Sequence, residues 1–411
     1  MNQKKVVIIG AGHAGVQTAA SLRDEGFDGN IRLIDAQAAL PYQRPPLSKA
    51  FLKGDASKDR IVLRGEQFYR DRAIDLVLGT NVSGIDTQTN AVQLTTSKPI
   101  AYDYLVLATG ARARPLAIEG ANLSGVFSLR DLADAENIRV CLAHAVNIVV
   151  IGAGFIGLEF AAVAAAQGVS VTVIEPQNRV MARAISTDMS KAFGQKHRVL
   201  GVKLMLGCGV SRLHGEGGVV SNVETTDGHR LAADMVIVGI GVLAEDRLAQ
   251  AACLACANGI VTDGHLLTST SNIYAVGDNN SHPNAYFGGR LRMESVQNAV
   301  DQAKCVARTI AGSASPYRAV PWFWSDQADY KLQIAGVSKG LSHHVLRGDS
   351  TSAAFSVFGF EGQRLAVVES LNRPADHMVA RRLIGANIPL APEQAADPDF
   401  DLRGLASRSP L

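Results

Sequence analysis

The chain has 411 residues, of which 47% are hydrophobic and 19% charged, and its formal net charge is +2 at pH 7. This length allows two to three domains, each with its own core. The nearly neutral balance argues against a global basic surface for nucleic acid. The most apolar stretch, residues 148–158, is eleven residues long and contains three glycines, too short for a membrane span. We therefore expect neither nucleic acid nor membrane as a partner.

The first predicted element is a β-α-β unit over residues 1–35. A β-branched strand at 6–9 runs into the sequence GAGHAG at residues 10–15. In this spacing the first glycine permits a tight turn, the second lets the backbone approach a pyrophosphate, and the third lets the helix pack on the strand. Asp35 ends the next strand, twenty residues past Gly15, where an acid accepts hydrogen bonds from ribose hydroxyls. This unit predicts one bound dinucleotide.

A stiff loop follows at residues 40–49, where three prolines forbid an ordinary helix or central strand before Leu47. Residues 60–79 mix helix and strand. Residues 81–93 read as strands with turns at Ser83-Gly84 and Thr89-Asn90. A buried strand at 104–110 ends in a small-residue turn.

A second copy of the first unit begins at residue 148. Its loop, GAGFIG at residues 152–157, follows a β-branched strand, and Glu175 ends the next strand eighteen residues past Gly157. Residues 235–241 repeat the pattern of 104–110. Since the arrangement recurs after 142 residues, we predict two related α/β modules, each binding a dinucleotide.

The last part of the chain changes pattern. A strand at 271–278 ends in Asp278, a helix is expected over 294–310, and a boundary lies near 312–316. The segments between 321 and 368 predict an antiparallel sheet with hairpins. A helix should cover 375–384, and the polar tail from Ala395 should be loose.

The ordered set of motifs resembles a known family. The set comprises both glycine loops, Pro-Pro-Leu-Ser-Lys at 45–49, Ala-Thr-Gly at 108–110, Tyr-Ala-Val-Gly-Asp at 274–278 and Pro-Trp-Phe-Trp-Ser-Asp-Gln at 321–327. It is similar to that of the NADH-dependent, FAD-containing ferredoxin reductases, the putidaredoxin reductase-like family, over nearly the whole chain. These proteins serve bacterial haem-thiolate monooxygenases and aromatic-ring dioxygenases.

The resemblance implies an α/β, glutathione-reductase-like flavoprotein with two dinucleotide-binding domains and a C-terminal α+β domain. An FAD-binding domain would comprise residues 1–109 and 242–319. Residues 110–241 would form the NADH-binding domain. Residues 320–411 would form a C-terminal antiparallel-sheet domain.

The resemblance also implies the residues of both cofactor sites. For FAD, the pyrophosphate residues are Gly10, Gly12, Ala14 and Gly15, and the ribose acid is Asp35. The residues implied at the flavin or its chain are Arg44, Lys49, Val82, Ala108, Arg130, Asp278, Val296 and Trp324. For NADH, the implied residues are Gly152, Gly154, Phe155, Ile156, Gly157, Glu159, Glu175, Arg183, Ile240 and Gly241.

Two of these residues carry the catalytic prediction. In the family, a lysine and a glutamate matching Lys49 and Glu159 meet beside the flavin N5, where they position the reactants and supply local charge. The residues alone leave a second interpretation equally open, an exposed helical glutamate and a loop lysine without a partner. Asp278 likewise keeps the alternative of an N-cap or turn aspartate.

The donor is predicted from the second module. Glu175 favours a free ribose 2′-hydroxyl and repels a 2′-phosphate, which predicts NADH over NADPH. Arg179 and Arg183 lie close enough in sequence to keep NADPH as a minority alternative.

The acceptor is predicted to be external. Cys253 and Cys256 have dithiol spacing, but they follow the strand that closes the second module, and no cysteine lies at 40–50, where disulfide reductases keep theirs. Electrons should therefore pass to a small acidic [2Fe–2S] ferredoxin that feeds an oxygenase. Basic residues are candidates to steer it. They are Arg64, Arg290, Arg292 and Lys304.

Two alternatives stay open. The acceptor would be rubredoxin in one, and the other is a redox-dependent binding flavoprotein like apoptosis-inducing factor. We predict no site metal, since His13, His343 and His344 lack metal-ligand spacing. With five cysteines and no signal-peptide pattern, we expect a cytoplasmic protein.

Overall fold

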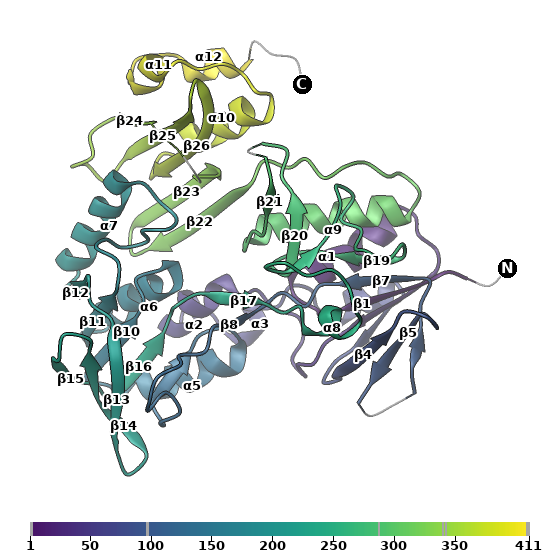
Figure 1. Ribbon diagram of the computed structural model, residues 1–411, viewed down its shortest axis with the longest axis horizontal. Coiled ribbons are helices and arrows are strands. Elements are labelled where there is room, and N and C mark those ends of the chain that lie inside the picture. Colours follow the sequence, from purple (N-terminus) through teal and green to yellow (C-terminus); the bar gives the residue numbers. More distant parts are fainter. Residues whose placement is uncertain (1–2, 96–97, 287, 339–340, 342, 408–411) are drawn as a thin grey trace. The chain divides into compact units, whose positions relative to one another are not determined.

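The structure is a computed structural model that describes residues 3–95, 98–286, 288–338, 341 and 343–407. The chain divides into two compact units, and Figure 1 labels many of their elements. The first unit comprises Met1–Gln43, Lys58–Arg112 and Val242–Pro321. The second comprises Arg44–Ser57, Ala113–Gly241 and Trp322–Leu411.

The first unit is built on a five-stranded parallel sheet in the order β19-β7-β1-β2-β3. These strands are β1 (Lys5–Ile9), β2 (Asn30–Ile34), β3 (Ile74–Val77), β7 (Tyr104–Leu107) and β19 (Ile273–Ala275). Alternate residues of β1 enter different cores. Val6 and Ile8 pack with residues of α1 (His13–Asp24) and α9 (Val296–Ile310), while Val7 and Ile9 belong to a second cluster. Because both faces are covered, the strand reads as one continuous apolar run.

Shorter elements complete the first unit. They are α3 (Lys58–Ile61), α4 (Glu66–Asp71), β4 (Val82–Asp86), β5 (Ala91–Leu94), β6 (Ile100–Ala101), α8 (Arg247–Ala251), β18 (Ile260–Val261), β20 (Asn280–Pro283) and β21 (Arg290–Leu291). β17 (Val242–Ala244) pairs with β8 (Ala111–Ala113). The turn predicted at Ser83-Gly84 is wrong, because both residues lie within β4, at a register shift opposite β5. A glycine inside a strand often marks such an irregularity.

The second unit contains a matching parallel sheet in the order β12-β11-β10-β16-β9. Its strands are β9 (Val126–Ser128), β10 (Asn147–Ile151), β11 (Ser170–Glu175), β12 (Lys203–Leu206) and β16 (Met235–Val238). Its helices are α5 (Leu132–Leu142), α6 (Phe155–Ala166) and α7 (Thr187–Val199). In both sheets the strand before the glycine loop is central, with its successor on one side and the closing strand on the other. The two sheets therefore share one strand arrangement, as expected from the repeat in the sequence.

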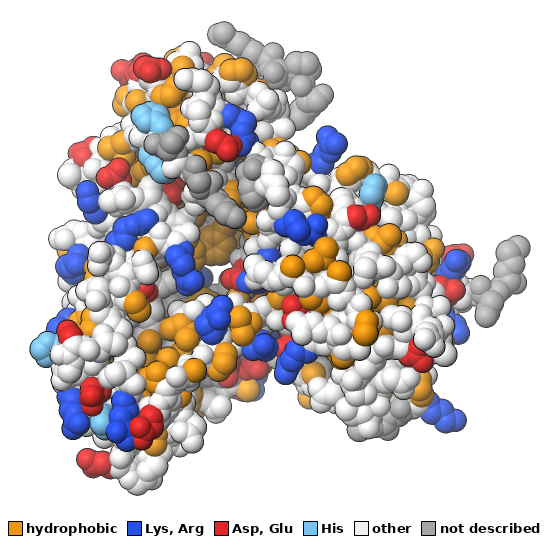
Figure 2. All heavy atoms as spheres, viewed as in Figure 1, with side chains coloured by type: hydrophobic (Ala, Val, Ile, Leu, Met, Phe, Trp, Pro, Cys, Tyr) orange, Lys and Arg blue, Asp and Glu red, His pale blue; other side chains and the backbone are white. Residues whose placement is uncertain are grey.

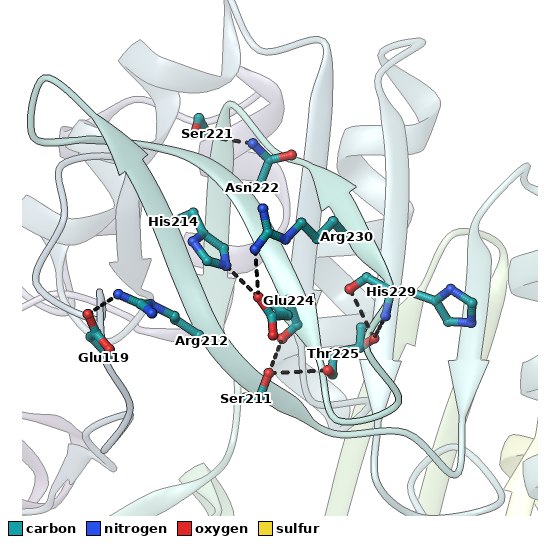
Figure 3. A network of polar contacts seen from close by, with 10 residues as sticks. All are labelled: Glu119, Ser211, Arg212, His214, Ser221, Asn222, Glu224, Thr225, His229 and Arg230. Carbon is teal, nitrogen blue, oxygen red and sulfur yellow. Dashed lines mark hydrogen bonds and ion pairs between the residues drawn. The ribbon is translucent and has the colours of Figure 1, made fainter.

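A three-stranded antiparallel sheet, β13 (Val210–Glu216), β14 (Val219–Thr225) and β15 (Arg230–Ala232), also belongs to this unit. Charged side chains of both signs gather over it in Figure 2. Glu224 accepts a hydrogen bond from His214 Nε2 at 2.6 Å and lies 3.4 Å from the guanidinium of Arg230 (Figure 3). The His214 hydrogen bond and the Arg230 charge hold the pKa of Glu224 below its usual value. These half-exposed contacts fix the cross-strand register of the sheet.

The C-terminal part of the second unit is an antiparallel sheet in the order β22-β23-β26-β25-β24. Its strands are β22 (Trp322–Gln327), β23 (Tyr330–Gly336), β24 (His343–Arg347), β25 (Phe355–Glu361) and β26 (Arg364–Leu371). The sheet is followed by α10 (Pro374–Gly385), α11 (Pro392–Ala396) and α12 (Leu402–Ser407). The predicted hairpins and the helix at 375–384 are confirmed.

The prediction of a loose tail from Ala395 is wrong over its described residues. Buried Arg347 on β24 donates to the carbonyl oxygens of Pro398 at 3.0 Å and Phe400 at 3.1 Å. Leu402 and Ala406 of α12 are also buried. The guanidinium of Arg347, some fifty residues earlier in the chain, therefore holds the tail in place. The polar composition of the tail alone does not reveal this distant partner.

Helix α7 joins the C-terminal sheet to the parallel sheet within the second unit. At its N-terminus Ser186 contacts Glu369 of β26, with both oxygens of Glu369 accepting from the Ser186 N–H at 2.8 and 3.0 Å. Further along, the ring of Phe193 packs edge-on against Tyr330 at 5.4 Å between centroids. These contacts explain why residues 322–411 cluster with 113–241, and the division into three domains stays a prediction.

Candidate functional site

The first glycine loop joins β1 to α1. Gly10 has a φ of +100°, and a Cβ there would lie 2.3 Å from the carbonyl oxygen of Ala108. A Cβ on Gly15 would lie 1.8 Å from the carbonyl oxygen of Gly10. A Cβ on Gly12 would meet no protein atom within 4 Å. The protein's own packing therefore requires Gly10 and Gly15, whereas Gly12 borders open space that a pyrophosphate can enter.

Asp35 at the end of β2 holds this loop in place. Its Oδ2 accepts from the backbone N–H of Ala11 at 2.5 Å, and its Oδ1 accepts from Gln37 N–H at 2.8 Å. A carboxylate has about four acceptor positions, so these two bonds leave capacity for ribose hydroxyls. The structure thus adds a loop-positioning role to the ribose role that the sequence predicts.

The second glycine loop, between β10 and α6, repeats this geometry. Gly152 has a φ of +101°, and a Cβ on Gly157 would lie 2.4 Å from the Gly152 carbonyl oxygen. At Gly154 the nearest atom to an added Cβ is 3.8 Å away. Glu175 accepts from Ala153 N–H at 2.8 Å, as Asp35 does in the first loop.

Both loops end in helices whose first turns lack a side-chain cap. Gly12 precedes α1 and Gly154 precedes α6, and neither offers a capping side chain. By contrast, Asp131, Ser186 and Ser295 cap α5, α7 and α9. Uncapped N–H groups and the positive end of the helix dipole fit a phosphate. The residues present therefore fit the pyrophosphate of one dinucleotide in each unit.

The segment ending at Asp278 meets both long helices of the first unit. A Cβ on Gly277 would lie 3.1 Å from the Cβ of Ala14 in α1 and 3.7 Å from that of Ala299 in α9. The predicted helix at 294 begins instead at Val296, two residues later. Asp278 lies in the turn that leads into β20, so it does not cap a helix, and the alternative of a turn aspartate describes its backbone position. Its end of the sheet therefore lies beside the first turns of α1 and α9.

The other residues predicted for FAD fall in different places. Ala108 lies against Gly10, and Val82 on β4 packs against the core that contains Val7 and Ile9. Arg44 and Arg130 lie in the second unit, where Arg44 Nη1 donates to the Arg130 carbonyl at 2.7 Å. Their contact with flavin stays a prediction.

The segment after Glu175 contains Arg179 and Arg183, the two arginines that kept NADPH as an alternative donor. They make different contacts. Arg179 donates to the carbonyl oxygens of Ala182 and Ile185, each at 2.7 Å. Arg183 is exposed, and its Nη2 lies 3.8 Å from the position of a Cβ on Gly241. Arg179 thus shapes its own loop, while Arg183 and Gly241 are brought together as predicted residues of one site.

Lys49 and Glu159 form a buried ion pair in the second unit. Lys49 Nζ lies 2.8 Å from Glu159 Oε2, and the two side chains are 22% and 6% exposed. The alternative of an exposed glutamate and an unpartnered lysine is therefore wrong for both residues. Removing one partner would leave the other charge without its counter-ion in a largely buried position, so either single substitution in the pair is destabilising. Its catalytic role stays a prediction.

Aromatic side chains lie on β22 and at the start of α6. The ring of Phe155 lies 4.6 Å from that of Phe323, centroid to centroid, and Trp324 lies 5.6 Å from Trp322. Ile156 is 39% exposed. Ile240 is partly buried against the core of the second parallel sheet. These placements supply apolar surface beside the second glycine loop, though no cofactor contact follows from them alone.

Sequence reasoning missed the polar partners of Glu159. Ser48 Oγ donates to Glu159 Oε2 at 2.5 Å, and Ser325 Oγ donates to Glu159 Oε1 at 2.7 Å. A signal for Ser325 was present, since Ser325 and Gln327 are polar residues on the same face of a strand whose inward positions should be apolar. The sequence signal for Ser48 was limited to its position next to Lys49.

The four basic residues considered for docking differ in their contacts within the protein. Arg290 donates to the Thr262 carbonyl at 2.5 Å, and Arg292 lies 2.7 Å from Glu294. Arg64 and Lys304 are exposed. Arg290 is exposed as well, and Arg64 also donates to the Leu63 carbonyl at 2.8 Å, so the steering role of all four stays a prediction.

The two units together define an oxidoreductase class that binds two different dinucleotides in one chain. Residues 4–303 match the model of the pyridine nucleotide-disulphide oxidoreductase family, and residues 322–406 match the reductase C-terminal domain. The chain is 48% identical over 403 residues to rhodocoxin reductase of Rhodococcus erythropolis, covering 98% of this chain and 94% of that protein. It is also 39% identical to a rubredoxin-NAD(+) reductase of Pseudomonas putida, over 90% of this chain and 96% of that protein.

Solved structures agree. A ferredoxin reductase for the CYP199A2 system of Rhodopseudomonas palustris matches with a TM-score of 0.96 and 44% identity, covering 98% of this chain and all of that one. Putidaredoxin reductase in its covalent complex with putidaredoxin matches with a TM-score of 0.96 and 37% identity, with 98% of each chain covered. The chain therefore belongs to the pyridine nucleotide-disulphide oxidoreductase family, in its ferredoxin reductase branch. It is an FAD-dependent oxidoreductase that uses NAD(H), as the sequence predicted.

A membrane span was also sought. Across the described parts of the chain, no helix has the length and apolar character needed to cross a bilayer.

Proposed function

We propose that the protein transfers electrons from NADH through FAD to a [2Fe–2S] ferredoxin, which in turn supplies a monooxygenase or ring-hydroxylating dioxygenase. When bound, FAD accepts hydride from NADH as an electron pair and releases electrons singly. The protein's share is to bind, orient and charge-balance the two cofactors.

The observation that carries this proposal is the chemistry of residues 45–49. Disulfide reductases keep cysteines in this loop, whereas here Ser48 and Lys49 contact Glu159. All five cysteines are free, and burial raises the pKa of Cys256. A thiol with a raised pKa forms less thiolate, and is therefore a poor nucleophile, which argues against redox chemistry at Cys256. With no dithiol in this loop to receive them, electrons leave to an external carrier. Five free cysteines also support a reducing, cytoplasmic location.

The donor site favours NADH. Glu175 ends β11 and is fixed by its bonds from Ala153 N–H and Gln177 N–H. Its negative charge attracts ribose hydroxyls and repels a 2′-phosphate. Arg179 uses its guanidinium within the loop, so it supplies no obvious phosphate partner.

The Lys49–Glu159 pair is assigned to the hydride-transfer step. An ammonium held at 2.8 Å from a buried carboxylate supplies a fixed local field and a positioned donor. We propose that this pair orients the reacting rings and sets the charge beside them, as the family resemblance implies. Gly152, Gly154 and Gly157 bind the NADH pyrophosphate, and Gly10, Gly12 and Gly15 that of FAD.

Rubredoxin is the second candidate acceptor. A relative named as a rubredoxin-NAD(+) reductase aligns over 90% of this chain, whereas one named as a ferredoxin–NAD(P)(+) reductase aligns over 98%. The greater coverage favours a ferredoxin.

The experiment is steady-state electron transfer from NADH with purified holoprotein and a panel of ferredoxins and rubredoxins. We expect turnover with a [2Fe–2S] ferredoxin that falls steeply with ionic strength, since an acidic carrier is steered by charge. Turnover with rubredoxin alone would show that the acceptor is rubredoxin and not a ferredoxin. Slow reduction and no turnover with any carrier would favour the redox-dependent binding flavoprotein.

A further inference from the structure

A buried row of polar side chains runs from Glu159 to α7 within the second unit. Ser325 Oγ lies 2.7 Å from Glu159 Oε1, Gln327 Nε2 lies 3.2 Å from Ser325 Oγ, and His197 Nε2 lies 2.9 Å from Gln327 Oε1. Ser325, Gln327 and His197 are each 0% exposed, and Glu159 is 5% exposed. Buried polar groups are costly unless they are hydrogen-bonded. A row of four such groups is therefore a built feature.

The charge on Glu159 fixes the direction of every bond in this row. An ionised carboxylate only accepts, so Ser325 must give its single proton to Glu159 Oε1. Ser325 Oγ then accepts from the amide N–H of Gln327, which turns the Gln327 carbonyl toward His197. His197 must therefore carry its proton on Nε2. Burial lowers the pKa of His197, partly offset by the Gln327 bond, so the ring is neutral near pH 7.

The second carboxylate oxygen is held from the other side. Ser48 donates to Glu159 Oε2 at 2.5 Å, and Lys49 Nζ lies 2.8 Å from the same atom. Both oxygens of Glu159 thus have a serine donor, supplied by different segments of the chain. A carboxylate fixed in this way cannot rotate away from Lys49 without breaking a buried hydrogen bond, which is unfavourable because the serine hydroxyl would be left without an acceptor.

We infer that Ser325, Ser48 and Gln327 are positioning residues that hold the Glu159 carboxylate oriented on Lys49. The inference rests on the proposed function, because it assigns these residues to the hydride-transfer step through the ion pair. Ser325 and Ser48 act directly on Glu159. Gln327, anchored by His197, acts one step further away, so its effect is smaller.

Kinetic experiments use the FAD-loaded protein and anaerobic stopped-flow reduction by NADH. We expect Ser325→Ala to lower the limiting rate of flavin reduction about tenfold, with little change in the NADH concentration at half-maximal rate. Gln327→Leu should lower it less. Ser370→Ala is the matched control, since Ser370 is 0% exposed on the same sheet and its hydroxyl has no hydrogen-bond partner among the described residues. That control should leave the rate unchanged.

A double-variant cycle tests whether Ser325 acts through Glu159. In the Glu159→Gln background, Ser325→Ala should cause little further loss, whereas a purely structural role would give additive losses. If Ser325→Ala fails to fold, Ser48→Ala on a separate segment serves in the same cycle. Unchanged rates in both serine variants, beside a slow Glu159→Gln, would overturn the inference. A fast Glu159→Gln variant would overturn the proposed role of the pair itself.

A readout independent of turnover is the chemical labelling of Lys49. We expect acylation of Lys49, measured by mass spectrometry, to be several-fold faster in Ser325→Ala than in Ser370→Ala, because the amine loses a well-placed carboxylate. Equal labelling rates in the two variants would contradict the inference.

Discussion

Asp35 and Glu175 occupy equivalent places in the two nucleotide modules, since each accepts a hydrogen bond from the residue after the first glycine of its loop. The distances are 2.5 Å from Ala11 N–H and 2.8 Å from Ala153 N–H. Each acid therefore shapes a glycine loop as well as presenting charge to a ribose. The two roles are separable by substitution.

The first prediction concerns Glu175. Glu175→Gln keeps an acceptor for Ala153 but removes the charge, so we expect the ratio of kcat/KM for NADH over NADPH to fall about tenfold while NADH binding persists. Glu175→Ala removes both, and should also weaken NADH binding. The measurement is kcat/KM with each donor. Unchanged selectivity in both variants would refute the assigned role of Glu175.

The second prediction separates the two cofactors by their middle glycines. Gly12→Ala places a methyl group where no protein atom lies within 4 Å, so the chain should fold but lose FAD. Gly154→Ala should keep FAD and weaken NADH binding at least tenfold. FAD absorbance per chain and NADH titration report the two effects. Gly15→Ala is the contrasting control, since its Cβ would lie 1.8 Å from the Gly10 carbonyl oxygen and should unfold the module.

These loops show how far sequence carries the fold. The two β-α-β units, their repetition along the chain and the acids that end β2 and β11 all follow from apolar runs and glycine spacing, which are local signals. The hydrogen bonds that Asp35 and Glu175 accept from their loops do not follow from these signals. Their partners lie 24 and 22 residues away, and such a separation leaves no periodic pattern in the sequence. The hydrogen bonds from Ser48 and Ser325 to Glu159 join residues that are even further apart, by 111 and 166 positions. Such contacts become visible only when the chain has folded.

The third prediction concerns the ion pair. Lys49→Ala leaves the Glu159 carboxylate buried without its cation, and should lower the free energy of unfolding by about 1–3 kcal/mol. It should also slow flavin reduction by NADH at least tenfold. The paired variant Lys49→Met with Glu159→Leu removes both charges and should recover part of the stability but not the rate, since Ser48 and Ser325 lose their acceptor. Recovery of the rate as well would exclude a role for the pair in hydride transfer.

The fourth prediction concerns Glu369 on β26. Burial, partly offset by hydrogen bonds from Ser186 and the charge of Arg179, raises the pKa of Glu369 to about 7, with Asp188 also nearby. Between the ordinary glutamate pKa and about 7, the folded state binds more protons than the unfolded chain, so stability falls as pH rises through this window. Glu369→Gln should therefore be more stable than the parent at pH 8, by about 1–3 kcal/mol, and equal to it near pH 4.5.

Denaturant unfolding at the two pH values tests this prediction. A gap for Glu369→Gln that is the same at both pH values would contradict the assignment.

The most direct measurement is an anaerobic titration of the purified yellow holoprotein with NADH, followed by flavin absorbance. A single flavin with no thiol pair behind it predicts full bleaching at about one NADH per chain, and far weaker bleaching by NADPH. A colourless protein that refuses FAD, or a requirement for about two NADH per chain as for a flavin coupled to a redox-active disulfide, would contradict the account.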